Sequence, residues 1–226
     1  MDTQTLVNKT NRKLNGEYEE IEFESDDWNN IVDALNYGID LWNKAGDWRS
    51  KYDPEYSIGT VGDDIYYQID NNEVNSISFS DRARVVFKDS DGKVISRYKI
   101  VSQDVFDLAN DNDEIATINM NGLQIKQKES TSSIYGCDIY LPVFHKEKPL
   151  TTKTQVCRVD DPYWVIDIAA ADLAATSPVE FIARNAQGYI KSANNRMIVM
   201  KKDNRGTQSS SSAIGQWCPS GRPDGR

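Results

Sequence analysis

The chain has 226 residues, of which 38% are hydrophobic and 27% charged, so one large or two small domains can bury a hydrophobic core. This composition excludes a chain that is disordered throughout. The 13 glycines and 7 prolines are ordinary usage, which excludes collagen-like and low-complexity architectures. A formal net charge of −9 argues against a broad phosphate-binding face and favours solubility.

Cysteine usage and hydropathy indicate a cytoplasmic product. The three cysteines, Cys137, Cys157 and Cys218, have no CxxC spacing and predict free thiols rather than a disulfide framework or a zinc cage. No apolar run is long enough to span a membrane, and residues 1–16 lack the apolar core of a signal peptide. We therefore expect no association with membranes.

The N-terminal residues 1–25 are polar, and we interpret them as an extended arm with at most a short strand at residues 21–23. A helix is predicted from Asp26 to about Gly46, with Ser25 or Asp26 as its N-cap. Its apolar residues recur at three- and four-residue steps. They are Trp28, Ile31, Val32, Leu35, Ile39 and Trp42. This tryptophan-bearing face is expected in the core, and the alternative is a surface that faces a partner.

Residues 57–144 show a hydrophobic period of two, which is typical of strands. Turn residues at 62–64, 89–92 and 119–122 separate the segments. The predicted strands are Ile58–Val61, Ile65–Ile69, Ile77–Phe79, Arg84–Phe87, Val94–Ile100, Ile115–Ile118 and Leu123–Lys126. This pattern predicts an antiparallel meander, a small sandwich or an open barrel. One helical turn is predicted at residues 102–108.

The C-terminal third returns to helical spacing. Residues 141–160, with Pro142 and Pro149, are interpreted as a return linker. A helix begins after Asp161, and a second one begins at Pro178 and ends in the basic cluster Lys201, Lys202 and Arg205. The Ser-rich residues 206–226 lack core-forming density and are predicted to be a flexible C-terminal tail.

The order of these elements predicts an α+β fold. The first helix cannot bury its tryptophans alone, and the two C-terminal helices are the nearest apolar partners. We expect a discontinuous α-helical bundle, made of the N-terminal helix and the two C-terminal helices, with an inserted antiparallel β region. The domain limits are residues 1–25 for the arm, 26–56 and 145–205 for the bundle, 57–144 for the β region and 206–226 for the tail.

The residues offer no recognisable catalytic or cofactor-binding motif, so we predict no enzyme, no cofactor and no metal site. The only histidine, His145, has no second histidine or nucleophile near it in sequence. Carboxylates at 111–114 and at 89 and 91 have the oxygen ligands that Ca²⁺ prefers, but without EF-hand spacing they are interpreted as hairpin tips. Sequence-specific binding of nucleic acid is not expected at this net charge.

Two segments carry a resemblance to a known family. Residues 27–68 contain WNNIVDALNYGIDLWNKAGDW and SIGTVGDDIYYQID, and residues 159–204 contain VDDPYWVIDIAAADLAATSP and NNRMIVMKKDN. Together with YKIVSQDVF between them, they resemble the head-to-tail adaptor or connector proteins of tailed bacteriophages, of the tail tubular protein A type. The resemblance extends over roughly half the chain, with DDPYW and the Ala-rich helix as its most distinctive part.

This resemblance implies a virion structural protein, located in the virion and, during assembly, in the host cytoplasm. It implies a helical bundle with an inserted β region and a ring of about a dozen copies below the portal. The implied partners are further copies of the chain, the portal protein and the tail tube or nozzle proteins. Genomic DNA would pass through the lumen of the ring without sequence-specific binding.

Four residues are candidate partner contacts. Trp217 is a lone aromatic in the polar C-terminal tail and suits a partner's pocket. Lys201, Lys202 and Arg205 form the basic end of the last helix, where compensation of the helix dipole is a sufficient structural role.

Two other functions stay open at this point. The 5 tryptophans, 11 tyrosines and 6 phenylalanines, together with many short strands, suggest a carbohydrate- or cell-surface-binding module. A glycosidase that uses two acids is the third hypothesis, since such pairs are assembled in space rather than along the chain.

Overall fold

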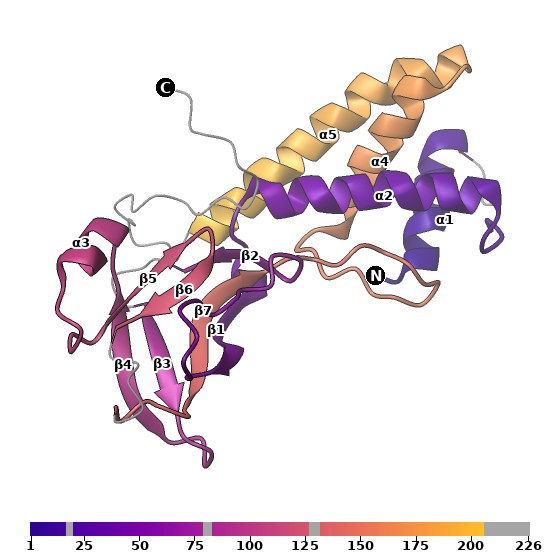
Figure 1. The fold of residues 1–226 in the computed structure, drawn as a ribbon. Coiled ribbons are helices and arrows are strands. Elements are labelled where there is room, and N and C mark those ends of the chain that lie inside the picture. Colours follow the sequence, from indigo (N-terminus) through magenta and orange to yellow (C-terminus); the bar gives the residue numbers. More distant parts are fainter. Residues whose placement is uncertain (17–19, 79–82, 127–131, 206–226) are drawn as a thin grey trace. The chain divides into compact units, whose positions relative to one another are not determined.

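A computed structural model describes residues 1–16, 20–78, 83–126 and 132–205. These residues form five α-helices and seven β-strands, so the chain is α+β, as predicted (Figure 1). It divides into two compact units. Among the described residues, the helical unit combines residues 1–50 with residues 147–205, and the sheet unit contains residues 51–146. The helical unit is therefore formed by the chain segments that precede and follow the sheet unit in the sequence.

The expectation of an extended N-terminal arm is wrong for residues 3–15, which form helix α1 (Thr3–Asn15). Asp2 caps this helix by accepting a 2.7 Å hydrogen bond from the backbone N–H of Thr5. Hydrogen bonds from the side chain and the backbone of Thr5 lower the pKa of Asp2. Leu6 and Val7 are fully buried in the core of the helical unit. The described residues 20–25 contain no strand, so the strand expected at 21–23 is also wrong.

Helix α2 (Asp26–Ala45) follows the prediction closely. Ser25 is its N-cap and accepts a hydrogen bond of 3.2 Å from the backbone N–H of Trp28. All six apolar residues of the predicted face are buried, which confirms that this face belongs to the core. Trp42 stacks on Trp48 with a ring-centroid distance of 4.8 Å and an interplanar angle of 9°.

Helix α4 (Pro162–Thr176) is in contact with each of the other helices of this unit. It begins after Asp161, which caps it through the backbone N–H of Tyr163 at 3.0 Å. It packs against α1, against α2 and against α5 (Glu180–Arg205). A Cβ atom on Gly38 of α2 would lie 3.1 Å from Cγ1 of Val165, so α2 approaches α4 closely at this glycine.

The sheet unit is a mixed sheet with strand order β1-β7-β3-β4-β5-β6, and β2 also pairs with β7. The strands are β1 (Tyr52–Thr60), β2 (Val74–Ile77), β3 (Arg84–Lys88), β4 (Val94–Ile100), β5 (Ile115–Asn119), β6 (Gly122–Ile125) and β7 (Asp138–His145). The β4–β5 pair is parallel, which corrects the expected antiparallel region. A parallel pair needs a longer connection, and here that connection contains α3 (Gln103–Leu108).

Strand β7 lies where the sequence predicts a return linker, and this prediction is wrong for residues 141–145. Pro142 lies opposite a register shift in β1, between Asp53 and Tyr56, where the missing N–H breaks no regular ladder bond. The strand predicted at 65–69 is also absent from the described residues, which show there only the isolated bridge between Tyr67 and Leu123.

The first and last strands of the sheet unit are neighbours. Tyr52 at the start of β1 pairs with Phe144 near the end of β7. The chain therefore enters and leaves this unit at adjacent positions, as is usual for an inserted domain. Its core is separate from that of the helical unit and includes Val85, Phe87, Tyr98, Ile139 and Leu141.

Candidate functional site

A fully buried carboxylate lies at the centre of the helical unit. Asp167 of α4 forms an ion pair with the ammonium of Lys13 from α1. Its Oδ2 accepts hydrogen bonds from Ser192 Oγ at 2.6 Å and from Arg196 Nε at 3.0 Å, both on α5. Arg196 Nη1 also donates to Asp161 Oδ2 at 2.9 Å. One carboxylate therefore links three helices.

Tyrosine rings flank the cations of this network. The Lys13 ammonium lies 5.3 Å from the ring centroid of Tyr189, and the Arg196 guanidinium lies 5.3 Å from that of Tyr163. Burial lowers the pKa of Lys13, and the nearby Arg196 guanidinium lowers it further. The arrangement thus holds two cations, one of them partly desolvated, around a single buried anion.

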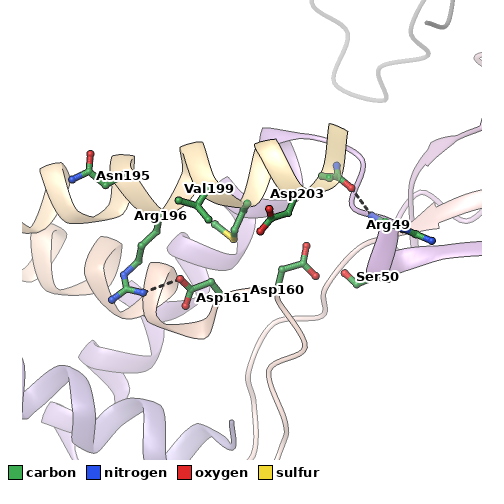
Figure 2. A pocket seen from close by; sticks show the side chains of 10 residues that line it. Arg49, Ser50, Asp160, Asp161, Asn195, Arg196, Val199 and Asp203 are labelled. Atoms are coloured by element: carbon green, nitrogen blue, oxygen red, sulfur yellow. Dashed lines mark hydrogen bonds and ion pairs between the residues drawn. The ribbon is translucent and has the colours of Figure 1, made fainter. Parts of the chain in front are cut away.

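A cleft of about 840 Å³ opens beside the network, between α5, the residues before α4 and the segment after α2 (Figure 2). Figure 2 shows the carboxylates of Asp160 and Asp203 directed toward one another, with Arg196 held on Asp161. Its lining residues are Arg49, Ser50, Asp160, Asp161, Asn195, Arg196, Val199, Met200, Asp203 and Asn204. The lining of the cleft therefore combines apolar side chains with charges of both signs.

Asn204 holds one end of this cleft. Its Oδ1 accepts a 3.0 Å hydrogen bond from the backbone N–H of Arg49, and its Nδ2 donates to the carbonyl of Asp47 at 2.6 Å. These bonds fix the last turn of α5 against the segment that follows α2.

The predicted partner residues of the basic cluster lie on this last turn. Lys201 and Lys202 are exposed and form no ion pair with any residue in the described ranges. Arg205 is the last residue of α5. Trp217 lies outside the described residues. On this turn the cleft is lined by Val199, Met200, Asp203 and Asn204, and neither Lys201 nor Lys202 is among its lining residues. Their partner role stays a prediction.

The outer surface of α5 carries exposed apolar side chains as well as cations. Phe181 is 73% exposed, Ile198 is 64% exposed and Val199 is 57% exposed. Exposed large apolar side chains of this kind can be covered by another macromolecule.

The other candidates of the sequence lie apart from this site. His145 Nε2 is 3.2 Å from Asp53 Oδ2 in the sheet unit. Cys137 and Cys157 are buried and form no disulfide within the described residues, and burial raises the pKa of Cys137. Asp89 accepts hydrogen bonds from the backbone of its own turn, at Asp91 and Lys93. Among the residues that the structure describes, no three His, Cys, Asp or Glu side chains are grouped so as to hold a metal ion.

The buried network was missed in the sequence, although one signal points to it. Asp167 is the only charged residue in the apolar run from Tyr163 to Ala171. A carboxylate at such a position needs a buried cation as a partner. Nothing in the spacing identifies Lys13 and Arg196 as those partners, because they come from helices far apart in the sequence.

Comparison of the sequence with protein-family models and with curated proteins finds no match to either. Within the described ranges, no helix has the length and apolar character required to cross a bilayer.

Proposed function

We propose that this chain is a head-to-tail adaptor of a tailed bacteriophage, a virion structural protein whose copies form a ring between the portal and the tail. The main support is the organisation of the chain, in which a helical unit built from two flanking segments carries an inserted sheet unit. This is the arrangement that the resemblance in residues 27–68 and 159–204 implies.

The surface of the helical unit supports an assembly role. A ring requires two different faces on each copy, one for each neighbour. Helices α2 and α5 both pack on α4 and both expose the side opposite their buried residues. The exposed apolar residues of α5, such as Ile198, have no cover in the described part of the chain.

The charge of the chain fits a channel through which DNA passes. A net charge of −9 disfavours tight contact with phosphates, so a duplex can slide past an acidic wall. The basic end of α5, with Lys201 and Lys202, is then available for the portal or a tail protein.

Electron microscopy of the purified full chain, alone and mixed with a portal protein of the same phage, tests this function. We expect rings of about a dozen copies, or a layer of this chain on the portal. A persistent monomer that also ignores the portal contradicts the proposal.

Variants at the predicted contacts sharpen this test. Lys201→Glu/Lys202→Glu and, separately, Trp217→Ala should weaken binding to the portal, measured by co-sedimentation. Lys93→Glu, an exposed change in the turn between β3 and β4, is the matched control and should bind as the wild type does.

A further inference from the structure

The exposed face of α2 carries regularly spaced acids. Asp26, Asp33 and Asp40 are seven residues apart, which places them on one side of the helix after every second turn. All three are exposed, and Tyr37 between them is 49% exposed. The opposite side is buried and includes Leu35. We call Asp26, Asp33, Tyr37 and Asp40 the acidic stripe.

The exposed face of α5 has the same spacing with the opposite charge. Arg184, Lys191 and Ile198 are seven residues apart and all exposed, and Ile198 is 64% exposed. The buried side of this helix includes Ala186, Ala193 and Met200. Helix α5 contains six basic and two acidic residues in a chain that is acidic overall. We call Arg184, Lys191 and Ile198 the basic stripe.

The charges in the middle of both stripes have no partner within the described residues. Asp33 and Lys191 form no ion pair there. Asp40 is paired only with Lys44 on its own helix, at 2.5 Å, and Arg184 only with Glu180 on its own helix. Exposed pairs of this kind contribute little and leave both carboxylate and guanidinium open to a further partner.

The two stripes match in length and are opposite in charge, with three carboxylates on the acidic stripe and two cations on the basic stripe. The first and last residues of each stripe, Asp26 and Asp40 or Arg184 and Ile198, are fourteen positions apart, which is about 21 Å of helix. Each stripe also carries one exposed apolar side chain, Tyr37 or Ile198, that a helix on the other side can cover. Opposite charge on the exposed faces of two helices of one unit favours a second copy of this chain as the occupant over nucleic acid, which only the basic stripe would attract.

We propose that the acidic stripe of one copy binds the basic stripe of the next copy. The contact joins two different faces, so it is heterologous and repeats from copy to copy, as a ring requires. It rests on the proposed adaptor function, for which it names the surfaces that join neighbouring copies. A single helix-on-helix contact is smaller than the about 800 Å² per partner of a stable interface, so each contact is weak and sensitive to salt.

Charge reversal of each stripe in the full chain tests this contact. Asp33→Lys/Asp40→Lys makes the acidic stripe basic, and Arg184→Glu/Lys191→Glu makes the basic stripe acidic. We expect each variant alone to associate at least about tenfold more weakly than the wild type in sedimentation velocity at low salt. Circular dichroism checks that each variant is folded. If a double variant does not fold, the single variant Asp33→Lys or Lys191→Glu takes its place, because neither change breaks an ion pair in the described residues.

The decisive measurement is an equimolar mixture of the two variants. Two copies of the same variant present stripes of like charge to each other, whereas two copies of different variants present stripes of opposite charge. We therefore expect the mixture to assemble, with the two variants in strict alternation. Asp104→Lys/Asp107→Lys on α3 is the matched control and should assemble as the wild type does. Assembly of each variant as strong as that of the wild type overturns the inference and leaves the adaptor function standing.

Two further outcomes also overturn it. A wild-type chain that stays monomeric and ignores the portal removes the adaptor function and this contact together. Anisotropy of a labelled DNA duplex provides the other outcome: if Arg184→Glu/Lys191→Glu loses duplex binding while assembly is unchanged, the basic stripe binds nucleic acid instead.

Discussion

Asp167 is the residue on which the stability of the helical unit depends most. It is fully buried, and its partners Lys13, Ser192 and Arg196 come from two other helices. A buried ion pair adds little net stability compared with an apolar core of the same shape, but removal of one partner leaves the other charge uncompensated. Replacement of Asp167 therefore lowers the free energy of unfolding by much more than the whole network adds to it.

Asp167→Asn should lower the free energy of unfolding by about 3 kcal/mol, because Lys13 and Arg196 then lose their shared anion. Urea denaturation followed by tryptophan fluorescence measures this, since Trp28, Trp42 and Trp164 all lie in this unit. Asp172→Asn is the control on the same helix; Asp172 is exposed, and this change should stay within about 0.5 kcal/mol of the wild type. Equal losses in the two variants contradict the role given to Asp167.

Local chemistry was predicted well where one or two neighbouring residues decide it. Ser25 and Asp161 are N-caps because their side chains reach amides two or three positions ahead, which is visible in the sequence. The partners of Asp167 were not predictable, because Lys13 and Arg196 lie 154 and 29 positions away. Such a network depends on packing, and hydrophobic periodicity carries no information about it.

At the scale of elements, α2 and α4 are held together by a close approach at Gly38. A Cβ atom there would lie 3.1 Å from Cγ1 and 3.3 Å from the carbonyl oxygen of Val165. Protein interiors are closely packed, so a larger side chain forces the two helices apart.

Gly38→Val should lower the free energy of unfolding by about 2 kcal/mol, because the branched side chain cannot fit against Val165. The same change at Gly188 of α5 is the control, since nothing lies within 4 Å of a Cβ there. It should be neutral or stabilise slightly, because valine has a higher helix propensity than glycine. Thermal denaturation of both variants compares them, and a Gly38→Val variant as stable as Gly188→Val contradicts the close packing.

The elements that were missed have a common cause. Helix α1 was interpreted as an arm because only Leu6, Val7 and Leu14 are strongly apolar in it, and its helical state depends on the burial of Leu6 and Val7 against other helices. Strand β7 was missed because Pro142 suggests a break, whereas a register shift in β1 accommodates it. Strands β3 to β6 were predicted nearly to the residue, because their alternation and turns are local.

At the scale of the whole molecule, the two units differ in how the chain builds them. The sheet unit is one continuous stretch, residues 51–146, whose first and last strands pair with each other. The helical unit needs residues from both sides of that stretch. The sheet unit therefore has what a domain requires to fold alone, a core of its own and adjacent ends.

A fragment of residues 51–146 should give a dispersed NMR spectrum and a cooperative thermal transition. A fragment of residues 83–126 is the control. It lacks β1 and β7, of which β7 is the strand paired with β3, and should remain unfolded because Val85 and Phe87 lose the neighbours contributed by β7. A disordered spectrum for the longer fragment contradicts the independence of the sheet unit.

The split construction of the helical unit also determines when it can form during translation. Helices α1 and α2 leave the ribosome first, but the surface that covers Trp28 and Trp42 is completed only after α4 and α5 have been synthesised, more than a hundred residues later. The sheet unit, being contiguous, is free to fold in the meantime and brings its two ends together. A nascent chain that stalls before Pro162 therefore leaves Trp28 and Trp42 without the cover that α4 and α5 provide.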